Sequence, residues 1–87
     1  MLKIRGIMES SEEPRVLIFC RLDEKKDLEP LAFIIASVCN SHFCIEYSTN
    51  EIREILEEIT KDKKIRNKNL MFGIERYQNS IAFLFGE

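Results

Sequence analysis

The pattern of apolar and polar positions predicts strands at both ends of the chain. Residues 2–8 alternate apolar and polar side chains with a period of two, which is typical of a strand. Residues 15–22 contain a nearly continuous apolar run, which indicates a central strand that is covered on both faces. A polar segment that ends at Pro14 separates the two, so we expect them to pair as a hairpin. Residues 80–85 predict a buried closing strand.

Helical periodicity predicts two helices in the middle of the chain. Apolar residues recur at helical spacing over residues 28–39, and Asp27 is a suitable N-cap for this first helix. Phe33 and Ile34 widen its apolar stripe almost all round, which favours deep burial or contact with a partner. The second helix is expected to begin at an S-x-x-E capping box, residues 48–51. Its apolar stripe consists of Ile52, Ile55, Leu56 and Ile59.

Two segments allow more than one structure. Residues 41–48 alternate like a short strand, but they are also consistent with a loop. Residues 61–68 are a loop or helix end that leads into a strand at residues 70–77. Alternatively, residues 64–72 form a helix that stops at Gly73.

These elements describe an α+β fold in one domain, residues 1–87. We expect a mixed sheet with an N-terminal β-hairpin, two or three helices and a closing C-terminal strand. The composition agrees, because 45% apolar and 32% charged residues are typical of a globular domain rather than a disordered chain.

Charge and hydropathy narrow the classes of function. The net charge of −2 argues mildly against non-specific wrapping of nucleic acid, although a local basic patch remains compatible with it. The longest apolar stretch, residues 31–39, is far shorter than the roughly 20 residues that span a bilayer. The alternating N-terminus is a strand rather than a signal peptide, so we expect a cytoplasmic protein.

The sequence contains no strong catalytic motif. The three cysteines Cys20, Cys39 and Cys44 are expected to be reduced. Together with His42 they have the chemistry of a zinc site, but their spacing is irregular, so we expect no metal. The same residues make a poor nucleophile and base pair, because neighbours along a strand point to opposite faces. We therefore expect a protein that is not an enzyme and has no cofactor.

Two kinds of surface remain as candidates for binding. The segment 61–68 has five basic residues that could hold phosphates, or that could simply be a solvated helix end. These residues are Lys61, Lys63, Lys64, Arg66 and Lys68. Phe33, Ile34 and Phe85 are candidates for a protein interface, and Phe85 is also a candidate for an open sheet edge.

The order of these elements resembles the small kinase-binding subunit of the KEOPS complex. The opening strand, residues 1–7, is similar to the first strand of that family. The segment Glu54-Ile55-Leu56, then Lys64-Ile65, Gly73-Ile74-Glu75 and the final strand resemble the family's E-I-L, R-Q-I, G-I/V-K/E and strand pattern. Residues 61–63 depart from it, because the family has a small Ser-Gly pair there.

The resemblance implies a non-catalytic, regulatory subunit in tRNA processing. KEOPS installs threonylcarbamoyl on an adenosine of tRNA, and its small subunit binds the kinase/ATPase subunit and helps recruit tRNA through the 3′ CCA end. The basic segment 61–68 would contact tRNA phosphates, and Tyr77 or Tyr47 would stack on bases. The alternative is a small homo-oligomeric or adaptor protein that has no role with nucleic acid.

Overall fold

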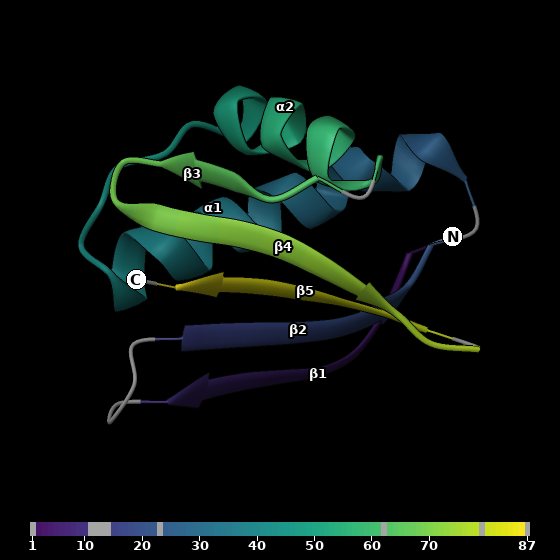
Figure 1. Ribbon diagram of the computed structural model, residues 1–87. Coiled ribbons are helices and arrows are strands. Elements are labelled where there is room, and N and C mark those ends of the chain that lie inside the picture. Colours follow the sequence, from purple (N-terminus) through teal and green to yellow (C-terminus); the bar gives the residue numbers. More distant parts are fainter. Residues whose placement is uncertain (1, 11–14, 23, 62, 79, 87) are drawn as a thin grey trace.

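Five strands form one antiparallel sheet, and two helices pack against one of its faces in the computed structural model (Figure 1). The structure describes residues 2–10, 15–22, 24–61, 63–78 and 80–86. In chain order the elements are β1 Lys3–Ser10, β2 Arg15–Arg21, the 3-10 helix η1 Lys25–Asp27, α1 Leu28–His42, α2 Thr49–Ile59, β3 Ile65–Asn67, β4 Leu70–Arg76 and β5 Ile81–Gly86. The α+β fold expected from the sequence is confirmed.

The strands lie in the order β1-β2-β5-β4-β3, and each neighbouring pair is antiparallel. The predicted N-terminal hairpin is present as β1 and β2. The sheet is therefore antiparallel where the sequence suggested a mixed one. The closing strand β5 lies in the middle, between β2 and β4, so the expectation that Phe85 lies at an open edge is wrong.

The core lies between the sheet and the helices. In β2 the alternate residues Val16, Ile18 and Cys20 are buried against the helices. On the same side of the sheet, the rings of Phe72 in β4 and Phe85 in β5 stack against each other, with their centroids 5.8 Å apart. Burial of such large side chains stabilises the fold by roughly 1.5–3 kcal/mol each.

Helix α1 begins at Leu28, as predicted, but it is longer than predicted. It continues to His42, so that residues 44–48 form a loop and not a strand. Asp27 precedes it, but the Asp27 carboxylate caps η1 and not α1. Its Oδ2 accepts a hydrogen bond from the Glu24 backbone N–H at 3.1 Å. Asp27 is therefore the N-cap residue of α1, as predicted, although its side chain makes no cap hydrogen bond to this helix.

Helix α2 has the N-cap and the buried face that its local sequence predicts. The Ser48 hydroxyl accepts a hydrogen bond from the Glu51 backbone N–H at 3.1 Å, which caps the helix as predicted. All four residues of the predicted stripe are buried: Ile52, Ile55, Leu56 and Ile59.

The segment after α2 is a hairpin. Lys68 and Asn69 form a two-residue turn between β3 and β4, and both have a positive φ, 48° and 70°. This combination is typical of the type I′ turn, whose twist matches that of the flanking strands. The alternative helix over residues 64–72 is therefore wrong, and the predicted strand at residues 70–77 is confirmed as β4.

Two further observations complete the fold. No helix in the described part of the chain is long and apolar enough to cross a membrane. The predicted turn that ends at Pro14 lies largely outside the described residues, as does Asn79 in the β4–β5 turn.

Candidate functional site

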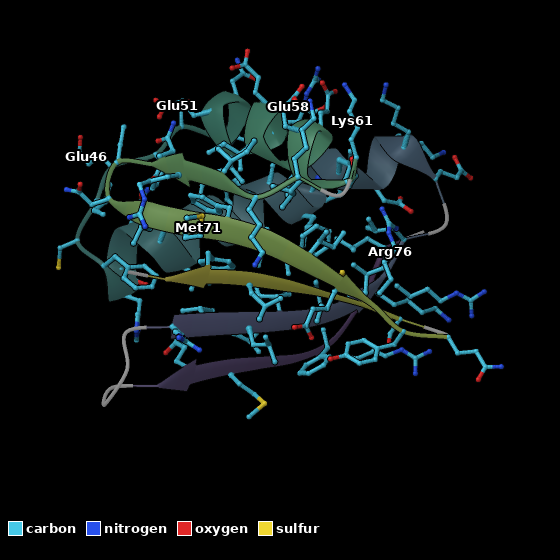
Figure 2. All side chains as sticks on the ribbon, viewed as in Figure 1. Glu46, Glu51, Glu58, Lys61, Met71 and Arg76 are labelled. Atoms are coloured by element: carbon cyan, nitrogen blue, oxygen red, sulfur yellow. The ribbon has the colours of Figure 1, made fainter. Side chains whose placement is uncertain are left out.

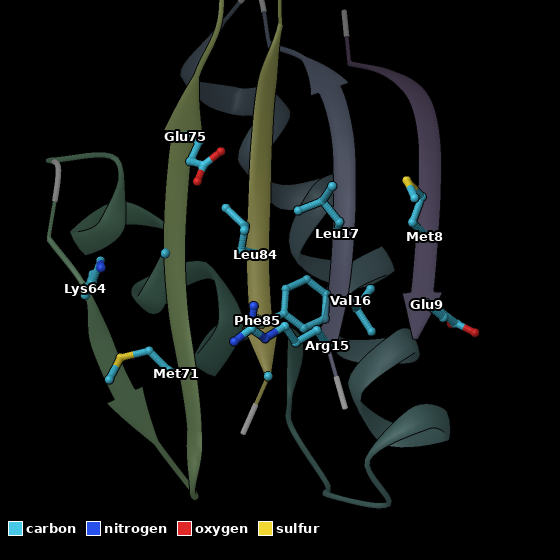
Figure 3. Close-up of a pocket in the computed structure, with 12 residues that line it drawn as sticks. Met8, Glu9, Arg15, Val16, Leu17, Lys64, Met71, Glu75, Leu84 and Phe85 are labelled. Atoms are coloured by element: carbon cyan, nitrogen blue, oxygen red, sulfur yellow. The ribbon is translucent and has the colours of Figure 1, made fainter. Parts of the chain in front are cut away.

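The basic segment 61–68 is divided between two sides of the sheet. Ile65 and Asn67 in β3 pair with the buried residues Phe72 and Leu70, so they lie on the helix side. Because side chains alternate along a strand, Arg66 lies on the opposite, uncovered face, where it pairs with Met71. Lys64, which precedes β3, reaches the same face (Figure 3).

The other lysines of the segment make ion pairs with α2. Lys61 Nζ and Lys63 Nζ lie 3.5 Å and 3.7 Å from the Glu58 carboxylate. Figure 2 shows Glu58 and Lys61 together beside α2. These pairs are exposed to solvent, where an ion pair contributes about 0–1 kcal/mol. This part of the segment therefore behaves as the solvated helix end that the sequence also allowed.

Lys68 is held at the opposite end of α2. Its Nζ lies 3.0 Å from Glu51 Oε2 and donates a hydrogen bond to the Glu46 backbone carbonyl at 2.6 Å. It also lies 4.8 Å from the centre of the Tyr47 ring, which is a cation–π distance. The hydrogen bond from Lys68 lowers the pKa of Glu51. Lys68 thus joins the β3–β4 turn to the loop before α2, which gives it a structural role.

The uncovered face of the sheet contains a hollow of about 500 Å³ (Figure 3). We call this surface the open face. The side chains on its floor are mostly apolar and come from four strands. They include Met8 of β1, Leu17 of β2, Met71 of β4 and Leu84 of β5.

Gly73 deepens the hollow, because it has no side chain. A Cβ atom added there would meet only the Lys64 side chain, at 3.9 Å. Gly86 lines the same hollow at the end of β5. The floor at these glycines is therefore backbone, which is accessible to a flat or narrow ligand.

Charged residues border the hollow. Lys64 and Arg15 line it, and Arg66 follows Lys64 by two residues on the same face of the sheet. The acidic residues Glu75 and Glu9 also line it. In Figure 3 the Glu75 side chain lies farther from Arg15 than the Met71 side chain does. The basic groups therefore gather around the Met71 end of the open face.

The two tyrosines proposed for base stacking have different environments. Tyr77 is 53% exposed, and its ring lies 6.4 Å from the ring of Phe19. Its hydroxyl donates a hydrogen bond to Glu75 at 2.7 Å, which raises the pKa of Tyr77. Tyr47 is only 5% exposed, so it belongs to the core and is not accessible for stacking.

The residues predicted for a protein interface also differ in their exposure to solvent. Phe33 is 64% exposed on α1, whereas Ile34 is half-buried against the core. Phe85 is only 2% exposed, because β5 is central and its ring faces the helices. Phe85 is therefore a core residue whose ring does not reach the surface, which corrects its assignment to an interface.

Sequence reasoning missed the open face. The apolar run 16–20 in β2 predicts a strand that is covered on both faces, but the helices cover only one of them. Leu17 and Phe19 lie half-buried on the other face. The continuous apolar run was nevertheless a signal, because it indicated a second apolar surface.

The cysteines do not form a site with His42. Cys20 and Cys39 are buried, and burial raises their pKa to about 11 and about 12. Cys44 is exposed. The His42 Nδ1 atom lies 3.8 Å from the Glu9 carboxylate. Among the described residues, no group of three or more His, Cys, Asp or Glu side chains is placed to hold a metal ion.

Comparison with known proteins finds no matching family model, no matching curated protein and no matching solved structure.

Proposed function

We propose that this chain is a non-catalytic binding subunit of a tRNA-modifying assembly of the KEOPS type. In this proposal it contacts tRNA with its open face and a kinase/ATPase subunit with a separate apolar surface, in the cytoplasm. The observation that carries the proposal is the position of Lys64 and Arg66. Lys64 lines the same apolar hollow as Arg15, and Arg66 lies on the same uncovered face of the sheet.

The chemistry of this surface suits a single RNA strand. The guanidinium and ammonium groups of Arg15, Lys64 and Arg66 are donors that match phosphate oxygens. The apolar floor offers contact for a ribose or a base. The exposed ring of Tyr77, at the end of β4, offers a stacking surface of the kind that single-stranded RNA uses. A 3′ CCA end is such a strand.

The net charge of −2 limits the mode of binding. A protein with this charge depends on a local cluster of cations rather than on a general positive field. The number of phosphates contacted is therefore small, and binding by the isolated chain is expected to be weak and sensitive to salt.

The test is a fluorescence-anisotropy titration with unmodified tRNA, with and without its 3′ CCA, over a range of salt concentrations. We expect binding that weakens when the CCA is removed. The variant Lys64→Gln/Arg66→Gln should bind more weakly. The slope of log K against log salt should fall by about 1.4, which corresponds to two contacts on a single strand.

The matched control is Lys61→Gln/Lys63→Gln. It removes the same charge from the same segment, but from lysines that pair with Glu58 on the helix side. We expect its tRNA affinity to change much less. Equal losses in the two variants would show that the segment acts only through its total charge. No binding at low salt would contradict a direct role of this chain in holding tRNA.

A second candidate function is a protein-interaction domain without nucleic acid. The observation that favours it is the exposed Phe33 ring on α1, together with the ion pairing of Lys61, Lys63 and Lys68. Under this function Phe33→Ser should abolish capture of the partner, whereas Lys64→Gln/Arg66→Gln should leave it unchanged. Under the tRNA function, only the second variant should affect tRNA affinity.

A further inference from the structure

The sheet has two edges, and they are protected to different degrees. At one edge, β3 is only three residues long, and α2 packs against it. At the other edge, β1 is eight residues long and pairs only with β2. Its outer backbone N–H and C=O groups therefore face away from the sheet, where another strand can pair with them.

Exposed apolar side chains concentrate on this edge. Among the described residues five large apolar side chains are exposed, and three of them are in β1. They are Ile4, Ile7 and Met8, which are 37%, 43% and 62% exposed. Single exposed apolar residues are common on protein surfaces, but a row of them along an unpaired strand indicates a contact surface.

At this edge, the three side chains lie on both faces of the sheet. Ile4 and Ile7 pair with Cys20 and Ile18, so they lie on the helix side of the sheet, beyond the cover of the helices. Met8 pairs with Leu17 and lies on the open face. A bulge between Ile4 and Gly6 disturbs the strand near its start, but residues 6–10 pair regularly. The edge strand β1 therefore contains a regularly paired segment, and apolar side chains lie on both faces of the sheet there.

We propose that a second copy of this chain pairs with β1 in antiparallel orientation, so that the two sheets become continuous. Twofold symmetry between antiparallel copies requires one residue to lie opposite itself. When this residue is Ile7, the two Ile7 side chains meet on the helix side. Arg5, which lies in the bulge between Ile4 and Gly6, is then brought opposite Glu9 of the second copy, and the twofold axis repeats this pair.

The same register also matches the two copies in shape. Met8 lies opposite Gly6 of the second copy, and both residues are on the open face, since Gly6 pairs with Phe19 and Met8 with Leu17. Gly6 has no neighbouring atom within 4 Å of where a Cβ would be, so this position has room for the Met8 side chain.

Neighbouring registers are less favourable. With Met8 on the axis, Ile7 would lie opposite Glu9, and Arg5 would lose its carboxylate partner. With Gly6 on the axis, Arg5 would lie opposite Ile7 and would again have no carboxylate partner. Only the Ile7 register of these three combines opposite charges with apolar and steric complementarity. This self-complementarity is the reason for proposing a second copy of the chain as the occupant.

The test measures the mass of the full 87-residue chain by sedimentation equilibrium. We expect a dimer that dissociates on dilution. Arg5→Glu alone places like charges opposite each other in both halves of the interface. It should therefore raise the dimer dissociation constant by about tenfold or more. Glu9→Arg alone should do the same.

The charge reversals also provide a rescue. The double variant Arg5→Glu/Glu9→Arg should dimerise again, because opposite charges face each other once more. An equimolar mixture of the two single variants should form mixed dimers for the same reason. Lys25→Glu, a charge reversal on exposed η1, is the matched control and should leave the dimer unchanged.

A variant that changes no charge tests the fit between Met8 of one copy and Gly6 of the other. Gly6→Val should weaken the dimer by filling the space for Met8, while the monomer accepts the side chain, as circular dichroism would verify. The proposal is overturned if the wild-type chain is monomeric at all concentrations, if the single reversals remain fully dimeric, or if the double reversal fails to restore the dimer.

Discussion

The Lys68 ammonium lies 3.0 Å from the Glu51 carboxylate, and this contact joins the β3–β4 turn to the first turn of α2. Along the chain, the rest of α2 and most of the basic segment lie between the two residues. Their pairing explains why Lys68 is not available in the way that Lys64 and Arg66 are. It also adds a contribution to stability that depends on the protonation of the Glu51 carboxyl group.

Acidification should destabilise the domain through Glu51. The pKa of Glu51 lies below its ordinary value of 4.5, chiefly because Lys68 donates a hydrogen bond to it. A carboxyl group whose pKa is lowered in the folded state stabilises the fold above its unfolded pKa. This stabilisation is lost as the pH falls through the folded pKa. Urea unfolding at several acidic pH values should therefore show a shallower loss of stability for Glu51→Gln. Glu54→Gln, on the same helix, should follow the wild type.

The β3–β4 turn should tolerate glycine better than its present residue at the second position. Asn69 has a φ of 70°, in the left-handed region, and glycine is preferred at this position of type I′ turns. We expect Asn69→Gly to raise the free energy of unfolding by about 0.5 kcal/mol, and Asn69→Ala to lower it. Gly73→Ala in the next strand is the contrasting control. The φ of Gly73 is not positive, so alanine requires no left-handed backbone there, and the added Cβ atom has room. If Asn69→Gly proved destabilising, the turn would not have this geometry.

The buried hydroxyl of Tyr47 should contribute measurably to stability. It donates a hydrogen bond of 2.7 Å to the Asn67 carbonyl, and burial raises the pKa of Tyr47 to about 12. Tyr47→Phe should cost about 1–2 kcal/mol, since the carbonyl would lose its partner. Tyr77→Phe removes a hydroxyl that bonds to Glu75 at the surface, and it should change stability by less than about 0.5 kcal/mol. Thermal unfolding of both variants would measure the difference, and equal effects would argue against burial of Tyr47.

The three thiols should react at very different rates. Cys44 is exposed, whereas Cys20 and Cys39 are buried with a raised pKa and hence little thiolate. With a disulfide reagent near pH 8, we expect one thiol to react quickly and the other two only on unfolding. Cys44→Ser should abolish the fast phase, and a fast phase that survives this change would show that a second thiol is accessible.

Local patterns in the sequence are sufficient to predict several helices and strands. The stripe from Ile52 to Ile59 and the Ser48 cap involve residues within a few positions of each other, so helix α2 was predicted correctly. The alternation in β1 and the apolar run in β2 likewise predicted a hairpin. The α+β class follows from these elements, because each has an apolar side that must be covered by another.

The candidate site could be predicted only in part. The sequence singled out the basic segment 61–68, but it did not show that Lys64 and Arg66 would separate from Lys61, Lys63 and Lys68. That separation depends on β3, a strand of three residues whose existence requires pairing with β4. Such a short segment has too little periodicity of its own to define which side chains share a face.

The sequence alone is sufficient to predict the local elements, the apolar stripe of α2 and the basic segment 61–68 as a candidate for binding. Which face of the sheet stays uncovered, and which strands lie at its edges, depends on the tertiary structure. Phe85 illustrates the difference, since the same apolar strand would expose it at an edge but buries it in the middle of the sheet. The physical reason is that the position of a strand depends on the burial of apolar surface from distant parts of the chain, which no local pattern contains.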